Sequence, residues 1–266
     1  MNIDRIVFCL NASPLYSGMW DIVSKVYTQK TKYKPTLIFV GTKEELYREV
    51  KHDYGEVYRV DPVPDYVVNP NLDWTVMWTC YWYMANKFSN DVCMLSGIDE
   101  IPCNNMVAEI AKQVPDDKYF FPLGPNPYGN NIVANGWSIA KGSVLKNVLG
   151  IEDDLRDELK RIWENKDDFC KRVPQNHHDV RRRGWWGMDE AYISSVVYGH
   201  PDAVFLSDAD AKNLFFSRRI TRNSMCSYDV EKMKQGAYWA VHMVRPITEE
   251  SNKKIIDKIL YDLDVR

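Results

Sequence analysis

Short segments rich in β-branched and aromatic residues recur along the first half of the chain, and each is bounded by turn-forming residues. Segments with apolar residues at helical spacing separate the first of them. Strands are predicted at 6–10, 36–40, 56–60, 92–95 and 118–123, and helices at 17–30, 42–50 and 74–88. Strands that alternate with helices in this way predict parallel βαβ units with right-handed crossovers, and therefore an α/β fold.

The second half is less regular. Helical spacing continues at 102–114, 142–149 and in the C-terminal tail 248–266, and two further strands are expected at 204–206 and within 236–246. Residues 152–168 are strongly charged but keep apolar groups at helical spacing, which predicts an exposed amphipathic helix within a charged insertion at about 152–183. Because no clean linker interrupts the pattern, we expect a single domain over 1–266.

Composition narrows the class of protein. With 266 residues, 45% of them hydrophobic and 27% charged, the chain can bury a sizeable core. The formal net charge of −3 argues against a general nucleic-acid coat. Six cysteines without a C-x-x-C pair, no basic and apolar leader, and no apolar run of about 18 residues predict a cytoplasmic protein with no transmembrane segment.

An acid pair marks the end of the predicted strand 92–95. Asp99 and Glu100 lie within Gly97-Ile98-Asp99-Glu100-Ile101-Pro102, directly after that strand. Open α/β sheets bind their ligands beyond the carboxyl ends of the strands. Carboxylates at such a place can hold a hard divalent cation that keeps phosphate oxygens as further ligands. The alternative is a turn whose acids are only solvated.

This stretch resembles the D-x-D-E-I-P form of the DxD motif of glycosyltransferases with the GT-A fold. The resemblance implies one GT-A domain with a mostly parallel mixed sheet flanked by helices, in which 1–101 bind the donor and 102–266 the acceptor. In that family the second Asp, here Asp99, binds Mn²⁺ or Mg²⁺, and the metal holds the diphosphate of a nucleotide sugar. Gly97 stands where the family has its first Asp, so ribose recognition is left unexplained.

A histidine near the C-terminus extends the resemblance. The apolar segment 236–246 carries His242, and in many GT-A enzymes a late histidine completes the coordination of the metal; imidazole is an acceptable ligand of Mn²⁺. A histidine satisfied within the core is the alternative. Arg245 is expected to neutralise the departing diphosphate. The remaining donor-binding residues that the resemblance implies, for a UDP-sugar, are Asn11, Ala12, Ser13, Asp73, Ile98 and Glu100.

A second stretch, 184–190, resembles the W-G-x-x-D/E element of inverting galactosyltransferase-like enzymes. The resemblance makes Asp189 the general base, with Glu190 as the second candidate, and a carboxylate that deprotonates the incoming hydroxyl suits a direct displacement. The alternative is a first helical turn stabilised by acids. The expected acceptor-binding residues are Trp185, Trp186 and Gly187, together with Asn135, Gly136 and Trp137 in a similar small-residue segment.

The predicted function is therefore a metal-dependent glycosyltransferase that works with inversion. The acceptor is a glycan, a lipid-linked saccharide, a protein or a modified nucleic acid. One alternative is a non-catalytic carbohydrate- or nucleic-acid-binding module. A sugar nucleotidyltransferase is disfavoured because the loop at 11–16 lacks that family's glycines and arginine. Ser207-Asp208-Ala209-Asp210 forms a second D-x-D string, whose late position predicts a loop or helix cap.

Overall fold

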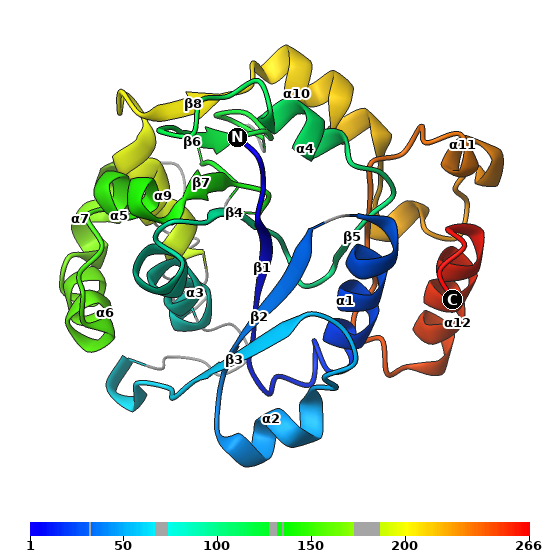
Figure 1. Ribbon diagram of the computed structural model, residues 1–266, viewed down its shortest axis with the longest axis horizontal. Helices are drawn as coiled ribbons and strands as arrows, with labels where there is room; N and C mark the ends of the chain where they lie inside the picture. Colours follow the sequence, from blue (N-terminus) through cyan, green and yellow to red (C-terminus); the bar gives the residue numbers. More distant parts are fainter. Residues whose placement is uncertain (32, 67–73, 128–131, 135, 173–186) are drawn as a thin grey trace.

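A seven-stranded mixed sheet forms the centre of the molecule (Figure 1). The computed structural model describes residues 1–31, 33–66, 74–127, 132–134, 136–172 and 187–266. The strand order is β3-β2-β1-β4-β7-β6-β8, and only β7 runs antiparallel to its neighbours. This confirms the expected mostly parallel sheet. The strands are β1 (Arg5–Leu10), β2 (Lys34–Val40), β3 (Glu56–Val60), β4 (Val92–Leu95), β6 (Tyr119–Phe121), β7 (Ile139–Lys141) and β8 (Ala203–Phe205).

Helices cover both faces of the sheet, and successive side chains of β1 therefore belong to two different cores, one on each face. Ile6 and Phe8 pack with α1 (Met19–Lys30), whereas Val7 packs with α3 (Trp74–Lys87) on the opposite face. In the described residues no helix has the length and apolar character needed to cross a bilayer. The other helices are α2 (Lys43–Glu49), α4 (Met106–Ala111), α5 (Gly142–Leu149), α6 (Leu155–Glu164), α7 (Lys166–Arg172), α9 (Met188–Val197), α10 (Asp208–Leu214), α11 (Val230–Lys234) and α12 (Glu250–Asp262), with short 3-10 turns at Pro64–Tyr66, Phe216–Arg218 and Arg222–Ser224.

Side chains cap the starts of two helices. Thr42 accepts a hydrogen bond from the backbone N–H of Glu45 at 3.2 Å, and the Glu45 carboxylate accepts from the N–H of Thr42, which completes a capping box at α2. Ser207 caps α10 in the same way, by accepting from the N–H of Asp210 at 3.1 Å. The second D-x-D string is therefore a helix start, as its position indicated.

The charged segment forms the predicted amphipathic helix α6. Its apolar face, including Leu159 and Ile162, is buried and its opposite face is exposed, but the burial of Glu158 was not predicted. Glu158 is fully buried, accepts a hydrogen bond from Trp78 Nε1 on α3 at 2.8 Å, and pairs with Arg161 at 2.7 Å. A buried carboxylate is tolerated when its oxygens are hydrogen-bonded and its charge is paired. The charges of this helix therefore support its packing against the domain.

A second, three-stranded sheet was not predicted. It consists of β5 (Glu100–Pro102), β10 (Ala240–His242) and β9 (Arg219–Ile220), with β10 in the middle. The predicted helix at 102–114 therefore starts later, at Met106, because Pro102 belongs to β5 and the Cys103 N–H donates to Trp239 O at 2.8 Å. This sheet joins the acid pair to the C-terminal part of the chain.

An ion-pair cluster links the amino ends of the first three strands and gives a pH-dependent prediction. Burial alone would raise the pKa of Glu56, but hydrogen bonds from Lys34, Arg5 and Tyr58 outweigh it and hold this pKa at about 2. A carboxyl whose pKa is lower in the folded state stabilises the protein above its unfolded pKa, about 4.3, and this stabilisation is lost as the pH falls toward 2. Since the group is partly exposed, Glu56→Gln is expected to cost only about 1 kcal/mol at pH 7.

Urea unfolding of wild type and of Glu56→Gln at pH 7 and pH 3.5 checks this expectation. The difference in free energy of unfolding should be smaller at pH 3.5, and an equal difference at both pH values would contradict it. Glu231→Gln, which removes a carboxylate from an exposed pair within α11, is the matched control and should have little effect at either pH.

Candidate metal and donor site

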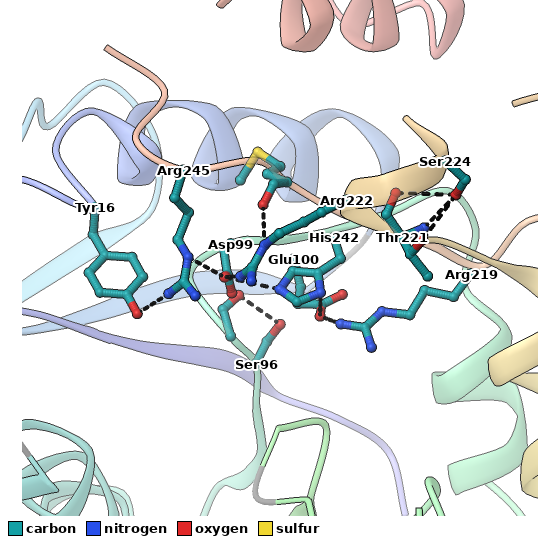
Figure 2. A network of polar contacts seen from close by, with 12 residues as sticks. Tyr16, Ser96, Asp99, Glu100, Arg219, Thr221, Arg222, Ser224, His242 and Arg245 are labelled. Atoms are coloured by element: carbon teal, nitrogen blue, oxygen red, sulfur yellow. Dashed lines mark hydrogen bonds and ion pairs between the residues drawn. The ribbon is translucent and has the colours of Figure 1, made fainter. Parts of the chain in front are cut away.

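The acid pair lies in the connection between the two sheets (Figure 2). A turn in which the Glu100 N–H donates to Gly97 O at 3.1 Å follows β4, and the Met243 N–H donates to Asp99 O at 2.7 Å. In the antiparallel pairing of β5 with β10, Glu100 and His242 are directly opposite each other. Side chains at paired positions point to the same face of a sheet. Residues that are more than 140 positions apart are thus fixed side by side.

Asp99, Glu100 and His242 form one cluster. One potential ligand atom from each residue lies within 4.8 Å of the other two. His242 Nε2 is 3.1 Å from Asp99 Oδ2, and His242 Nδ1 is 3.8 Å from Glu100 Oε1. The predicted acid and the predicted late histidine are therefore neighbours, and His242 is not an isolated core histidine.

Three arginines surround this cluster. Arg222 pairs with Asp99 Oδ2, Arg219 pairs with Glu100 Oε1, and Arg245 Nε lies 3.5 Å from Asp99 Oδ2. Sequence analysis named only Arg245. Arg219 and Arg222 belong to β9 and the turn after it, where nothing in the sequence marks a site, and only the pairing of β9 with β10 brings them to the acids.

These neighbours set the protonation states of the cluster. Burial would raise the pKa of Asp99, but the hydrogen bond with His242 and the charges of Arg245 and Arg222 hold it at about 2. Burial lowers the pKa of His242, and the Asp99 hydrogen bond only partly offsets it. Burial also lowers the pKa of Arg219, to about 10. At neutral pH the site offers an ionised carboxylate and a neutral imidazole, which are the forms that bind metals.

The cluster fits a divalent cation. An ion bound at 2.0–2.6 Å from its ligands joins atoms up to about 4–5 Å apart, close to the span observed here. Two carboxylates and an imidazole suit Mn²⁺ or Mg²⁺. Glu100 is only 5% exposed, and among the described residues its Oε2 has no hydrogen-bond partner. A buried carboxylate oxygen of this kind is costly to leave unpaired, and a bound cation would satisfy it.

Gly97 leaves room for the two acids. A Cβ atom at this position would lie 3.1 Å from Asp99 Oδ1 and 3.2 Å from Glu100 Cγ. A side chain in the place of the family's first Asp would therefore crowd both acids in their present positions. This gives a physical reason for the glycine and makes Glu100 the natural second carboxylate of the cluster.

The loop after β1 contacts Arg245, one of the arginines beside the cluster. The Ser13 N–H donates to Asn11 Oδ1 at 3.1 Å, and the Tyr16 N–H donates to Ser13 O at 3.1 Å, so residues 11–16 form a compact turn that includes Ala12. Tyr16 Oη then accepts from Arg245, whose guanidinium lies 5.0 Å from the centre of the Tyr16 ring. The predicted donor loop thus contacts the cluster through Tyr16, a residue that sequence analysis missed.

Two other residues, Ile98 and Asp73, were predicted to bind the donor. The Ile98 side chain is buried in the core, so only its backbone could meet a ligand. Asp73 lies outside the described residues.

The predicted base lies at the start of α9, on the α3 face of the sheet. Gly187 precedes the helix with φ 81°, a left-handed conformation that glycine adopts without strain, and Asp189 is 5% exposed while Glu190 is half-buried. Burial raises the pKa of Tyr81 on α3, and the charge of Asp189 is among the neighbours that raise it further. The carboxylate is therefore close to this buried phenol.

Residues on either side of Gly136 are anchored to different elements. The Val133 N–H donates to Ser194 Oγ on α9 at 3.0 Å, and the Trp137 N–H donates to Leu95 O at the end of β4 at 2.6 Å. Ser194 belongs to the second half of α9, so these bonds do not place Gly136 beside Gly187.

Trp137 is a core residue. It has φ 68°, and its ring is 3% exposed and packs edge-on against Trp239 at 4.7 Å between ring centres. In this position the ring cannot stack on a sugar, so a contact with an acceptor would have to come from the backbone. Asn135, Trp185 and Trp186 lie outside the described residues.

No protein-family model and no curated protein sequence matches the chain. Solved structures of glycosyltransferases are similar to it. The galactosyltransferase LgtC in complex with donor and acceptor sugar analogs shares 9% identity over 96% of this chain and 95% of LgtC, with a TM-score of 0.51. This likeness shows a GT-A-like fold.

Two larger glycosyltransferases give lower scores. GlyE of Streptococcus pneumoniae TIGR4 has a TM-score of 0.48 at 8% identity, over 99% of this chain. The bifunctional WbbM has a TM-score of 0.42 at 10% identity, over 98% of this chain. The chain spans 65% of the GlyE chain and 50% of the WbbM chain.

Proposed function

We propose that this protein is a metal-dependent glycosyltransferase, which moves a sugar from a nucleotide-sugar donor, expected to be a UDP-sugar, to an acceptor hydroxyl. The observation that carries the proposal is the cluster of Asp99, Glu100 and His242 at the carboxyl end of β4. In an open α/β sheet this is the place where ligands bind. The GT-A-like fold, which this chain shares with a galactosyltransferase, supports the same conclusion.

Asp99, Glu100 and His242 are the residues that would hold Mn²⁺ or Mg²⁺. When bound, the ion supplies Lewis-acid stabilisation of the leaving diphosphate. Arg245 adds a guanidinium beside Asp99 and is partly exposed, so it can neutralise phosphate charge. The turn at Asn11, Ala12 and Ser13 would contact the nucleoside, and the bond between Tyr16 and Arg245, which joins this turn to the metal cluster's surroundings, supports that role.

Asp189 is proposed as the general base, with Glu190 as the second candidate. It would accept the proton of the acceptor hydroxyl as that hydroxyl attacks the anomeric carbon, and a single displacement of this kind inverts the anomeric configuration. Of the predicted acceptor-binding residues that the structure describes, Gly136 and Gly187 are proposed to contact the acceptor. A glycan, a lipid-linked saccharide, a protein and a modified nucleic acid are all acceptors to be screened.

Thermal unfolding against UDP, GDP, CDP and ADP, each with Mn²⁺ and with EDTA, tests the donor and metal parts of the proposal. A ligand at a hundredfold excess over its dissociation constant stabilises the folded state by about 2.7 kcal/mol. We expect one nucleotide to raise the midpoint with Mn²⁺ and not with EDTA. A shift that is equal in EDTA would favour the metal-free binding module, and no shift with any nucleotide would contradict the proposal.

Catalysis itself is measured as release of the nucleoside diphosphate from the matching nucleotide sugar in the presence of an acceptor panel. A nucleotidyltransferase would instead release pyrophosphate from a nucleoside triphosphate and a sugar phosphate. The two products distinguish the two reactions.

A further inference from the structure

Arg222 is held in a fixed orientation beside Asp99. Its Nε donates to the backbone oxygen of Met243 at 2.9 Å, while its Nη2 pairs with Asp99 Oδ2 (Figure 2). Met243 in turn donates its own N–H to Asp99 O. One backbone unit therefore positions both the arginine and the acid, and the pair is built into the junction of the two sheets.

The oxygen that Arg222 binds is also a candidate metal ligand. His242 Nε2 lies 3.1 Å and Arg245 Nε lies 3.5 Å from this same Oδ2 atom. A carboxylate oxygen has two lone pairs, so it cannot keep all of these donors and accept a cation as well. A divalent cation at Asp99 would also repel a guanidinium bound to the same oxygen. Arg222 and a metal that binds through Oδ2 are therefore alternative partners of that oxygen.

Arg222 lies closer to solvent than the acids beneath it. The side chains of Arg222 and Arg245 are 32% and 26% exposed, compared with 13% for Asp99 and 6% for Glu100. The acids thus form the floor of the cluster and these two guanidinium groups its rim. A planar guanidinium with free N–H groups at the rim matches the oxygens of a phosphate group in bidentate geometry.

We propose that Arg222 exchanges partners during donor binding: it pairs with Asp99 when no cation is bound, and binds the diphosphate of the donor once a cation occupies Asp99. This inference rests on the proposed function, which supplies the cation and the diphosphate. Its Nε remains on Met243 O, so the exchange needs only a movement of the guanidinium tip. A second consequence is that the diphosphate and the cation bind cooperatively, because each removes a competitor of the other.

The test compares wild type with Arg222→Gln by titration calorimetry, with Mn²⁺ alone and with the tightest-binding nucleoside diphosphate of the panel at saturating Mn²⁺. Glutamine keeps a side-chain amide next to Asp99 but loses the charge. The variant should bind Mn²⁺ alone about twofold to fivefold more tightly, since the partly buried ion pair between Arg222 and Asp99 no longer competes. It should bind the nucleoside diphosphate about tenfold to a hundredfold more weakly, since a charged hydrogen bond to phosphate is lost.

Arg218→Gln is the matched control, because it makes the same substitution at an arginine four positions earlier in the chain, whose side chain is exposed. It should leave both affinities unchanged. Opposite changes in the two affinities confined to Arg222→Gln support the exchange. Weaker binding of both ligands would show a structural role and overturn it, as would no change in either.

The experiment separates this inference from the proposed function. If wild type binds Mn²⁺ and the nucleoside diphosphate and Arg222→Gln binds them equally well, the exchange is wrong and the glycosyltransferase proposal stands. If wild type binds neither ligand, the proposed function fails and the exchange fails with it.

Discussion

Replacing Asp99 by asparagine is expected to lower turnover at least about a thousandfold and to abolish the Mn²⁺-dependent binding of nucleoside diphosphate. A metal acting as Lewis acid on a leaving group contributes several kcal/mol, and each 1.36 kcal/mol is a factor of ten in rate. Asparagine keeps the shape of the side chain but removes the charge that holds the cation. The variant also leaves Arg222 and Arg245 with a neutral partner, so its thermal midpoint is measured alongside to show that it is folded.

Asp208→Asn is the control for this variant. It makes the same substitution in the second D-x-D string, at an exposed position in the first turn of α10, and should leave turnover and Mn²⁺ affinity unchanged. Release of nucleoside diphosphate and calorimetric titration of Mn²⁺ are the measurements. If Asp99→Asn keeps turnover within tenfold of wild type, Asp99 is not a metal ligand and this prediction is wrong.

Asp189→Asn is expected to lower turnover by about a hundredfold to ten-thousandfold, the usual contribution of a general base, while leaving nucleotide affinity unchanged. This separation of effects is expected because Asp189 belongs to α9, whereas Glu100 and His242 of the metal cluster belong to β5 and β10. Asparagine cannot accept the proton but has nearly the same volume, so the buried site is not emptied.

Glu190→Gln is the comparison, because it neutralises the adjacent carboxylate in the same helical turn. A loss of turnover in Glu190→Gln but not in Asp189→Asn would transfer the base to Glu190. The anomeric configuration of the product, determined by NMR, tests the chemistry independently: inversion is expected for a single displacement assisted by either base. Near-normal turnover in both variants would remove the carboxylate base from the proposal.

Much of the site was predictable because its signals are local. The strand 92–95 ends at an acid pair, and a short buried run followed by turn residues needs no tertiary contact to be recognised. The capping residues Thr42 and Ser207 bind backbone groups three residues away, so their sequence spacing contains the whole interaction. His242 and Arg245 were predicted from the family resemblance, and the structure places both beside Asp99.

Other features depend on contacts that no local pattern contains. The helical spacing predicted the buried apolar face of α6, but the burial of the charged Glu158 depends on Trp78 and Arg161, which satisfy its carboxylate. Trp137 has an aromatic ring of the kind that stacks on sugars, yet Trp239, from a segment about a hundred residues later, covers it. Burial is a property of the assembled elements, so periodicity alone could not assign these side chains.

By itself, the sequence determined the alternation of strands and helices, the parallel βαβ units and the position of the acid pair at a strand end, because these follow from hydrophobic period and from turn chemistry within a few residues. The mixed sheet was implied by the family resemblance. Only the tertiary structure showed the other partners of that pair. Arg219 and Arg222 reach Glu100 and Asp99 through the pairing of β10 with β5 and β9, and Tyr16, in the loop after β1, contacts Arg245. The physical reason is that electrostatic and ligand-binding properties depend on distance in space, and the strand pairing that sets those distances joins residues more than a hundred positions apart.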